Sequence, residues 1–234
     1  MKKQILLFSF IALVAVSCQN RFVTNTYEAR KFDHKRVAVI PLESIYTGNI
    51  PEGVTPEDIA KIEDAESIRF QELVHSRLIF KAGTRRSEIA LDFVSPSIIN
   101  SKLSAAGIST REAATMDPVK LAEVLEVDVI ARGNVTMNRF ISDLQSLKIE
   151  AVETIARQVL AAFKVPVFVP GSGTLGRTYR IDSNLELLDA TDGAVLWKTA
   201  LVRNADWSYK PEDAVASLAN QHAAAFPYRN REFK

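Results

Sequence analysis

Cysteine is nearly absent from this chain of 234 residues, since Cys18 is the only one. A single cysteine excludes any disulfide within the chain. Histidine is almost as rare, and its three positions lack the short spacing of metal-ligating pairs. Neither the G-x-S-x-G turn of serine hydrolases nor the H-E-x-x-H helix of metalloproteases occurs. We therefore expect no catalytic residue, no bound cofactor and no metal site. The three histidines are His34, His75 and His222.

Strong net charge and long apolar runs are also lacking. The formal net charge is +1, so a broad electrostatic surface for nucleic acid is not expected. The most apolar stretch, Ile5 to Val16, is interrupted by Ser9 and is too short to remain in a bilayer as a helix. No later stretch is long and apolar enough to span a membrane. The hydrophobic fraction of 47% is that of an ordinary globular protein.

Residues 1–17 have the layout of an export signal. Two lysines precede the apolar stretch, and small residues at Ala15 and Ser17 lead to Cys18. This end resembles the bacterial lipobox, except that Ala15 stands where that pattern usually has leucine. An ordinary secretory signal followed by a coincidental cysteine is the alternative. We expect cleavage before Cys18 and a lipid anchor on Cys18, and the resemblance implies an acyl chain such as palmitate on the new amino terminus.

Residues 18–35 are predicted to be a polar, lipidated tether, and residues 36–234 a single α/β domain with a mixed β-sheet flanked by helices. Apolar, β-branched runs predict strands, and capping residues followed by proline predict helix starts. The predicted strands are 36–42, 88–94, 127–135, 180–188 and 194–202, and an acidic, turn-rich loop follows the first of them through Gly48 and Gly53. The predicted helices begin at Thr55-Pro56, Ser95-Pro96, Asp117-Pro118 and Pro211.

The last two strands form the clearest signal. They flank residues 189–193, whose Asp192-Gly193 pair is typical of a hairpin turn. Val195, Trp197, Thr199 and Leu201 are predicted to share one face of the second strand. Trp197 is therefore expected in the core.

A long insertion, 141–176, precedes this hairpin. Within it, the apolar residues of 143–163 recur at intervals of three and four, which predicts a helical insertion and not membrane-spanning strands. That helix could pack on the domain, dock on another subunit or lie on a membrane. Residues 171–176 match G-x-G-x-x-G, but a strand-like segment follows where nucleotide binding needs a helix. We expect no nucleotide site there.

Four segments together resemble the CsgG-like lipoprotein superfamily. They are VAVIPL (37–42), VSPSIINSKLSAAGI (94–108), KLAEVLEVDVIARGNVT (120–136) and LELLDATDGAVLWKTALV (185–202). The superfamily includes the curli-secretion channel and the penicillin-binding-protein activator LpoB. The resemblance implies an α/β domain in the periplasm, usually at the outer membrane, that acts through protein contacts. Gln19 after the anchor cysteine is compatible with outer-membrane sorting by the same resemblance.

Two departures limit what the resemblance implies. The insertion lacks the alternation of the curli channel's membrane hairpins, and the tether is shorter than that of the activator. The sequence therefore favours a non-catalytic cell-envelope lipoprotein that serves as an assembly, scaffold or secretion-associated module. Its expected partners are the membrane, through Cys18, and copies of itself or other envelope proteins. A regulator of a peptidoglycan synthase and an enzyme with an unrecognised site are the alternatives.

Overall fold

The structure is a computed structural model, and it describes residues 21–48, 53–82, 91–139, 179–205 and 211–228. The described strands are β1 (Arg21–Val23), β2 (Arg36–Val39), β3 (Glu43–Gly48), β4 (Asp92–Phe93), β5 (Val129–Arg139), β6 (Tyr179–Asp189) and β7 (Val195–Ala205). The described helices are α2 (Asn25–Arg30), α3 (Pro56–Ala82), α4 (Pro96–Ala105), α5 (Thr110–Thr115), α6 (Pro118–Leu125) and α8 (Pro211–Ala225).

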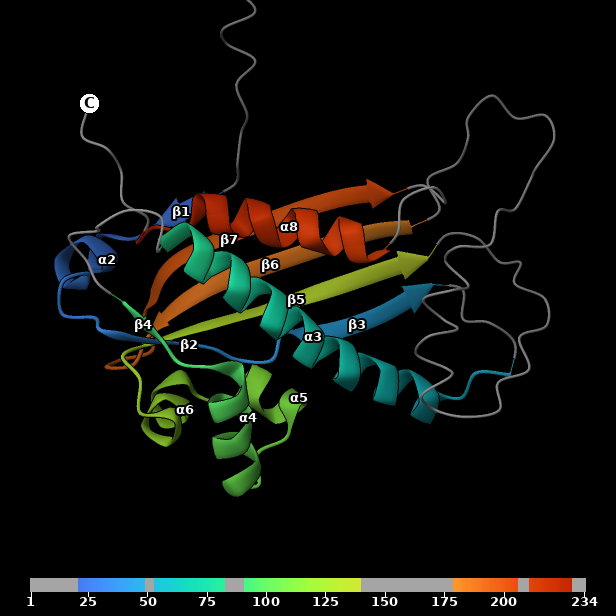
Figure 1. Ribbon diagram of the computed structural model, residues 1–234, viewed down its shortest axis with the longest axis horizontal. Helices are drawn as coiled ribbons and strands as arrows, with labels where there is room; N and C mark the ends of the chain where they lie inside the picture. Colours follow the sequence, from blue (N-terminus) through green and yellow to red (C-terminus); the bar gives the residue numbers. More distant parts are fainter. Residues whose placement is uncertain (1–20, 49–52, 83–90, 140–178, 206–210, 229–234) are drawn as a thin grey trace, which may run out of the picture.

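The strands form one mixed, seven-stranded sheet (Figure 1). Its order is β1-β7-β6-β5-β2-β4, and β3 also pairs with β5. The long strands β5, β6 and β7 are antiparallel, whereas β2 and β3 run parallel to β5. The expected single α/β domain with a mixed sheet and flanking helices is confirmed.

Helices cover the sheet on both faces. The helices α3 and α8 lie side by side over one face, and their apolar side chains form the larger core with β5, β6 and β7 (Figure 1). The shorter helices α4, α5 and α6 pack on the opposite face, around β2 and the start of β5. Because parallel strands need cover on both sides, β2 is buried between the two cores.

Beyond α4 to α6, the second face of the long strands carries polar side chains that pair across strands. The Arg132 guanidinium lies 3.1 Å from a Glu186 carboxylate oxygen, and Lys198 Nζ lies 3.6 Å from the other oxygen. Two residues further along these strands, on the same face, the Asn184 amide donates to the Asn134 side chain at 3.0 Å. Cross-strand pairs of this kind suit a solvated face of an antiparallel sheet. We call this part of the sheet the open face.

Short-range signals in the sequence predict their elements well. The side chain of Asp117 accepts hydrogen bonds from the backbone N–H groups of Val119 and Lys120, both at 3.1 Å, and so caps α6. Gly193 has a φ of 72° at the predicted hairpin turn, in the left-handed region that favours glycine. Trp197 is fully buried, as expected.

The loop predicted after residue 42 is wrong over Glu43–Gly48, which forms β3. Pro41 has no backbone N–H to donate, and the chain leaves the ladder with β5 around this residue. The strand then resumes as β3, pairing with Asn134 to Arg139 of the same long neighbour. The polar composition of β3 suggests a loop, but β5 extends past β2 and offers it an edge to pair with.

The predicted common face of β7 is partly wrong. A register shift between Leu187 and Leu188 brings Leu188 opposite Val195 and Leu187 opposite Trp197. Leu196 is therefore the extra residue of a bulge, and the alternation changes there. Val195 packs with the core under α6, on the face away from Trp197. The short helix α5 was also not predicted.

None of the helices in the described ranges has the length and hydropathy needed to cross a membrane. The predicted helix 143–163 and the G-x-G-x-x-G segment 171–176 lie outside the described residues. Residues 88–90 of the second predicted strand also lie outside the described residues. In the described part of that predicted strand, only β4 (Asp92–Phe93) forms.

Candidate functional site

The N-terminal segment, residues 21–35, is folded onto the sheet, so the prediction that residues 18–35 form a tether is wrong from Arg21 onward. Strand β1 pairs antiparallel with β7. Thr24 then joins the sheet to α2: its backbone N–H and its hydroxyl both donate to the Leu196 carbonyl, at 3.0 and 3.1 Å. The same hydroxyl accepts from the Tyr27 N–H at 3.2 Å and caps the helix.

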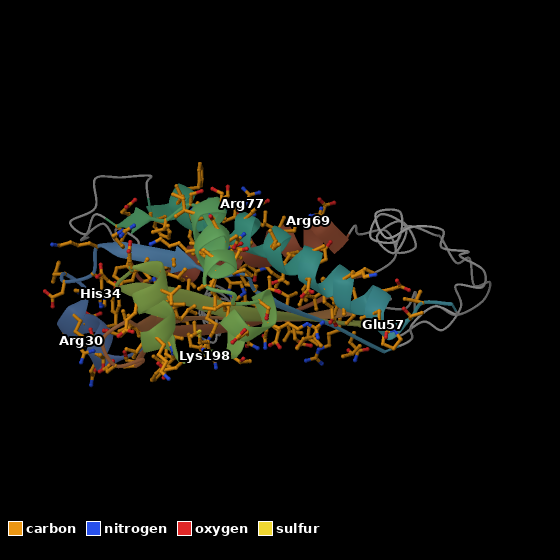
Figure 2. The ribbon with its side chains drawn as sticks, turned by 90° about the horizontal axis from the view of Figure 1, so that it is seen from below. Arg30, His34, Glu57, Arg69, Arg77 and Lys198 are labelled. Carbon is orange, nitrogen blue, oxygen red and sulfur yellow. The ribbon has the colours of Figure 1, made fainter. Side chains whose placement is uncertain are left out.

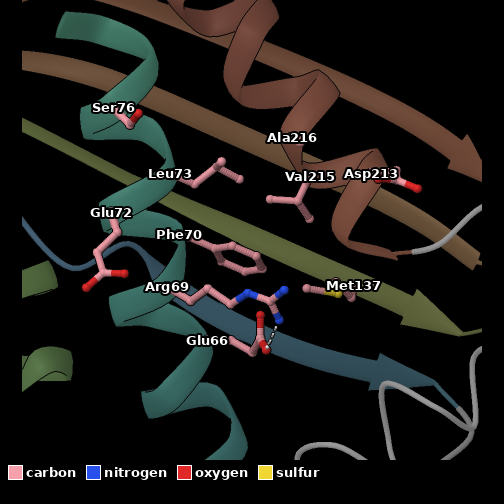
Figure 3. A pocket seen from close by; sticks show the side chains of 10 residues that line it. All are labelled: Glu66, Arg69, Phe70, Glu72, Leu73, Ser76, Met137, Asp213, Val215 and Ala216. Atoms are coloured by element: carbon pink, nitrogen blue, oxygen red, sulfur yellow. Dashed lines mark hydrogen bonds and ion pairs between the residues drawn. The ribbon is translucent and has the colours of Figure 1, made fainter.

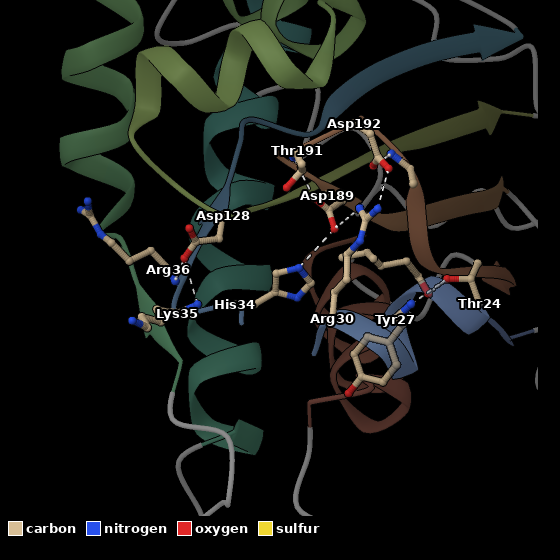
Figure 4. A network of polar contacts seen from close by, with 12 residues as sticks. Thr24, Tyr27, Arg30, His34, Lys35, Arg36, Asp128, Asp189, Thr191 and Asp192 are labelled. Carbon is tan, nitrogen blue, oxygen red and sulfur yellow. Dashed lines mark hydrogen bonds and ion pairs between the residues drawn. The ribbon is translucent and has the colours of Figure 1, made fainter. Parts of the chain in front are cut away.

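A buried carboxylate, Asp189, holds the other end of this segment (Figure 4). Its Oδ2 accepts from Arg30 Nη1 at 3.0 Å and lies 3.3 Å from His34 Nε2. Arg30 also reaches Asp192 Oδ2, at 3.0 Å, so its guanidinium spans two carboxylates of the hairpin turn. Burial raises the pKa of Asp189, but hydrogen bonds from the Thr191 N–H, Arg30 and His34 lower it, and the net shift is downward. Asp189 is therefore an anion with a fixed set of donors.

His34 connects this carboxylate to the C-terminal end of the described chain. Its Nδ1 lies 2.5 Å from the Tyr228 hydroxyl. Burial raises the pKa of Tyr228, so its hydroxyl keeps the proton and donates it to Nδ1. In the tautomer whose Nδ1 accepts this proton, Nε2 carries the ring proton and donates it to Asp189.

The order Asp189, His34, Tyr228 resembles the relay of a hydrolase, with a hydroxyl at the end. The burial of the three side chains argues against catalysis, because His34 is only 5% exposed and the other two are more buried still. The relay instead stabilises the position of the N-terminal segment.

Aromatic packing completes the attachment. The rings of Tyr27 and Tyr228 meet edge to face with centroids 4.9 Å apart, and Phe226 lies between Tyr228 and the core residue Trp197. Edge-to-face contacts of this kind add to the free energy of apolar burial. At the end of the segment, the backbone N–H groups of Lys35 and Arg36 donate to one oxygen of Asp128. The N-terminal segment is thus held along its whole described length.

The molecule also has a hollow of about 440 Å³ between α3 and α8 (Figure 3). Its base is apolar, formed by Phe70 and Leu73 of α3, Met137 of β5 and Val215 of α8. Glu66 and Arg69, 3.4 Å apart, lie at its border. The ten described lining residues include no histidine, so the hydroxyl of Ser76 has no imidazole base within the lining. They are Glu66, Arg69, Phe70, Glu72, Leu73, Ser76, Met137, Asp213, Val215 and Ala216.

The structure does not bring the three histidines together. His34 belongs to the N-terminal segment. His75 of α3 faces the edge of Phe93, and burial lowers its pKa. His222 is buried under the sheet with Nε2 2.9 Å from the Ser183 hydroxyl. Among the described residues, no cluster of His, Cys, Asp and Glu could hold a metal ion. Figure 2 shows Arg30 and His34 at one end of the molecule and Glu57 of α3 at the other.

The expected anchor residue, Cys18, lies outside the described residues. The attachment of the segment after it was missed by reasoning from the sequence. One local signal for it exists, because Thr24 followed by helix-forming residues up to Arg30 is a capped helix start. The partners on the hairpin and at the C-terminal end leave no comparable signal.

No protein-family model matches this sequence, and no curated protein sequence is detectably similar to it. Several solved structures share part of its backbone arrangement. Lipoprotein GNA1162 from Neisseria meningitidis is 9% identical with a TM-score of 0.42, covering 81% of this chain and 96% of that one.

A PelC dodecamer from Paraburkholderia phytofirmans is 14% identical with a TM-score of 0.39, covering 85% and 90% of the two chains. The LpoB C-terminal domain from Salmonella enterica is 8% identical with a TM-score of 0.37, covering 76% and 90%. These similarities concern the fold alone. Membership of the CsgG-like superfamily stays a prediction.

Proposed function

We propose that this protein is a lipid-anchored module of the bacterial cell envelope that works through protein contacts and not through catalysis. The export signal with Cys18 at its end supports the anchor. A thioether-linked lipid also explains why an exported chain carries a single cysteine that has no disulfide partner.

The observation that carries the proposal is the short distance along the chain between the anchor residue and the folded domain. Strand β1 begins at Arg21, three residues after Cys18. Three residues span at most about 10 Å even when fully extended. The anchor residue is therefore joined to the folded domain by a very short segment and not by a long flexible tether. The contacts with Asp189 and Tyr228 fix the residues that follow this segment to the sheet. Such a connection suits a scaffold that must hold a fixed position beside its membrane.

The surface between α3 and α8 fits a binding role. The one arrangement that resembles a catalytic relay is buried, and the hollow between α3 and α8 is apolar at its base. An apolar hollow with charged residues at its border is chemically suited to a side chain of a partner protein. We therefore favour an assembly or scaffold role, with the domain in the periplasm at the outer membrane.

The anchor is tested by metabolic labelling with a clickable fatty acid in the native bacterium. The wild-type chain should take up label, and Cys18→Ser should take up none and accumulate with its signal uncleaved. Ser17→Ala is the matched control, because it keeps a small residue before the cysteine and should label normally. Equal labelling of the wild-type and Cys18→Ser chains would end the lipoprotein proposal.

The partners are tested by in vivo crosslinking of the lipidated protein, followed by pull-down and mass spectrometry. Crosslinks between copies or to envelope assembly proteins are expected. A monomer that crosslinks only to a peptidoglycan synthase would instead support the regulator alternative. Substrate turnover by the purified protein that is lost when the residues of the α3–α8 hollow are changed would support the enzyme.

A further inference from the structure

We propose that one edge of the sheet rests on the membrane surface, with Phe22 in the lipid headgroup region. This edge consists of β1 and the outward side of β7, and we call it the β1–β7 edge. The inference rests on the proposed anchor at Cys18. It adds an orientation and a lipid contact that a lipid anchor alone does not require.

The position of the anchor residue selects this edge. Strand β1 is the last strand of the sheet on one side, and its first residue pairs with Thr199, near the middle of β7 (Figure 1). Since Cys18 lies within about 10 Å of Arg21, a lipid on Cys18 brings this long edge, and not a tip of the molecule, to the bilayer.

The side chains on the edge suit a lipid surface. All three residues of β1 are exposed although they belong to a sheet, and Phe22 is 61% exposed. The register places Phe22 opposite Lys198, on the open face of the sheet. Val202 lies four residues after Lys198 on β7, so it faces the same side of the sheet, and it is 56% exposed. An aromatic ring and a branched aliphatic group thus project beside the expected anchor.

The charge of the edge points the same way. The two strands contain no carboxylate, and Lys198 lies opposite Phe22 on the open face. Arg21 pairs with Thr199 and Arg203 donates to Ser217 of α8, so these two arginines lie on the other face of the sheet. A basic residue beside exposed apolar ones is attracted to anionic headgroups, and aromatic rings are favoured at the membrane–water interface. Lys198 also lies 3.6 Å from a carboxylate oxygen of Glu186 on the neighbouring strand β6. A bilayer with anionic lipid is therefore the partner that this surface fits.

The test places a spin label on the edge of the full-length, lipidated protein in vesicles of phosphatidylethanolamine and phosphatidylglycerol. Because the lipid consumes the Cys18 thiol, Phe22→Cys supplies the only free thiol for a nitroxide. Ile98→Cys is the control: Ile98 is 51% exposed, but it lies on α4, which packs near the opposite edge of the sheet. Accessibility to oxygen and to a water-soluble nickel chelate is measured by electron paramagnetic resonance.

At Phe22 the nickel accessibility should be several-fold lower than at Ile98, and the oxygen accessibility higher. Equal accessibility at the two positions in vesicle-bound protein would overturn the inference. Strong dipolar broadening between Phe22 labels without lipid burial would also overturn it, since the edge would then pair with a second copy. Vesicle flotation and the mass of the lipidated chain are recorded first. A chain that carries no lipid and does not float contradicts the proposed function. A chain that floats, but whose label at residue 22 is accessible to the nickel chelate, contradicts the orientation alone.

Discussion

Replacing Tyr228 with phenylalanine removes one oxygen atom from the attachment of the N-terminal segment. The ring, and with it the packing against Tyr27 and Phe226, is kept, so little cavity volume is created. The lost hydroxyl leaves Nδ1 of buried His34 without a donor. An unsatisfied buried acceptor costs about 1–3 kcal/mol, so Tyr228→Phe should lower the free energy of unfolding by that amount.

The assay is urea unfolding, followed by tryptophan fluorescence, of a chain that lacks residues 1–18, so that neither the export signal nor the lipid is present and no detergent is needed. The midpoint should fall while the slope of the transition stays the same. His34→Leu supplies the second arm of a double-mutant cycle. Because each single change leaves the other partner unpaired, the double variant should cost less than the sum of the two. An unchanged midpoint in Tyr228→Phe, or additive effects in the cycle, would refute the described contact.

Three further predictions concern the core. Burial lowers the pKa of His222 from 6.5 to about 4, so between these values the unfolded chain binds a proton at this residue and the folded chain does not. The contribution of His222 to stability is therefore fully present above pH 6.5 and decreases by about 3 kcal/mol as the pH falls to 4. His222→Gln should remove that part of the fall and leave the part due to His75, whose pKa is also lowered by burial. Equal pH dependence of wild type and variant in urea unfolding would contradict this. A Cβ at Gly133 would lie 2.3 Å from the Asn184 carbonyl oxygen, so Gly133→Ala should separate β5 from β6 and cost about 2 kcal/mol or more, seen as a lower Tm. Trp197→Ala should cost about 3–5 kcal/mol, and a cooperative melt near the wild-type Tm would show that the indole is not in the core.

The sequence predicts elements whose signals are local. The proline-flanked cap at Asp117 and the Asp192-Gly193 turn each depend on groups a few residues apart, and both are found as expected. Burial of Trp197 follows from strand alternation near that turn. The alternation fails only at Leu196, because a bulge depends on register with the partner strand and not on the strand's own residues.

The N-terminal segment shows why the rest was missed. Its composition is polar, and its stabilising partners are distant: Thr24 bonds across 172 residues to Leu196, and His34 across 194 residues to Tyr228. No window of sequence contains both members of such a pair. Strand β3 was missed for the same reason, since its polar residues form a strand only because β5 extends beside them.

These distant contacts also set an order of events during synthesis. Strand β1 has no partner until β7 has been made, and the contact of His34 with Tyr228 cannot form until the residues after α8 have been made. Closing a loop of this length is entropically costly and slow, so the first residues of the domain are the last to join it. An enzyme that modifies Cys18 before that moment meets a nearby segment free of the sheet. The docking of the C-terminal helix therefore ends the interval in which the amino-terminal end of the domain is easily processed.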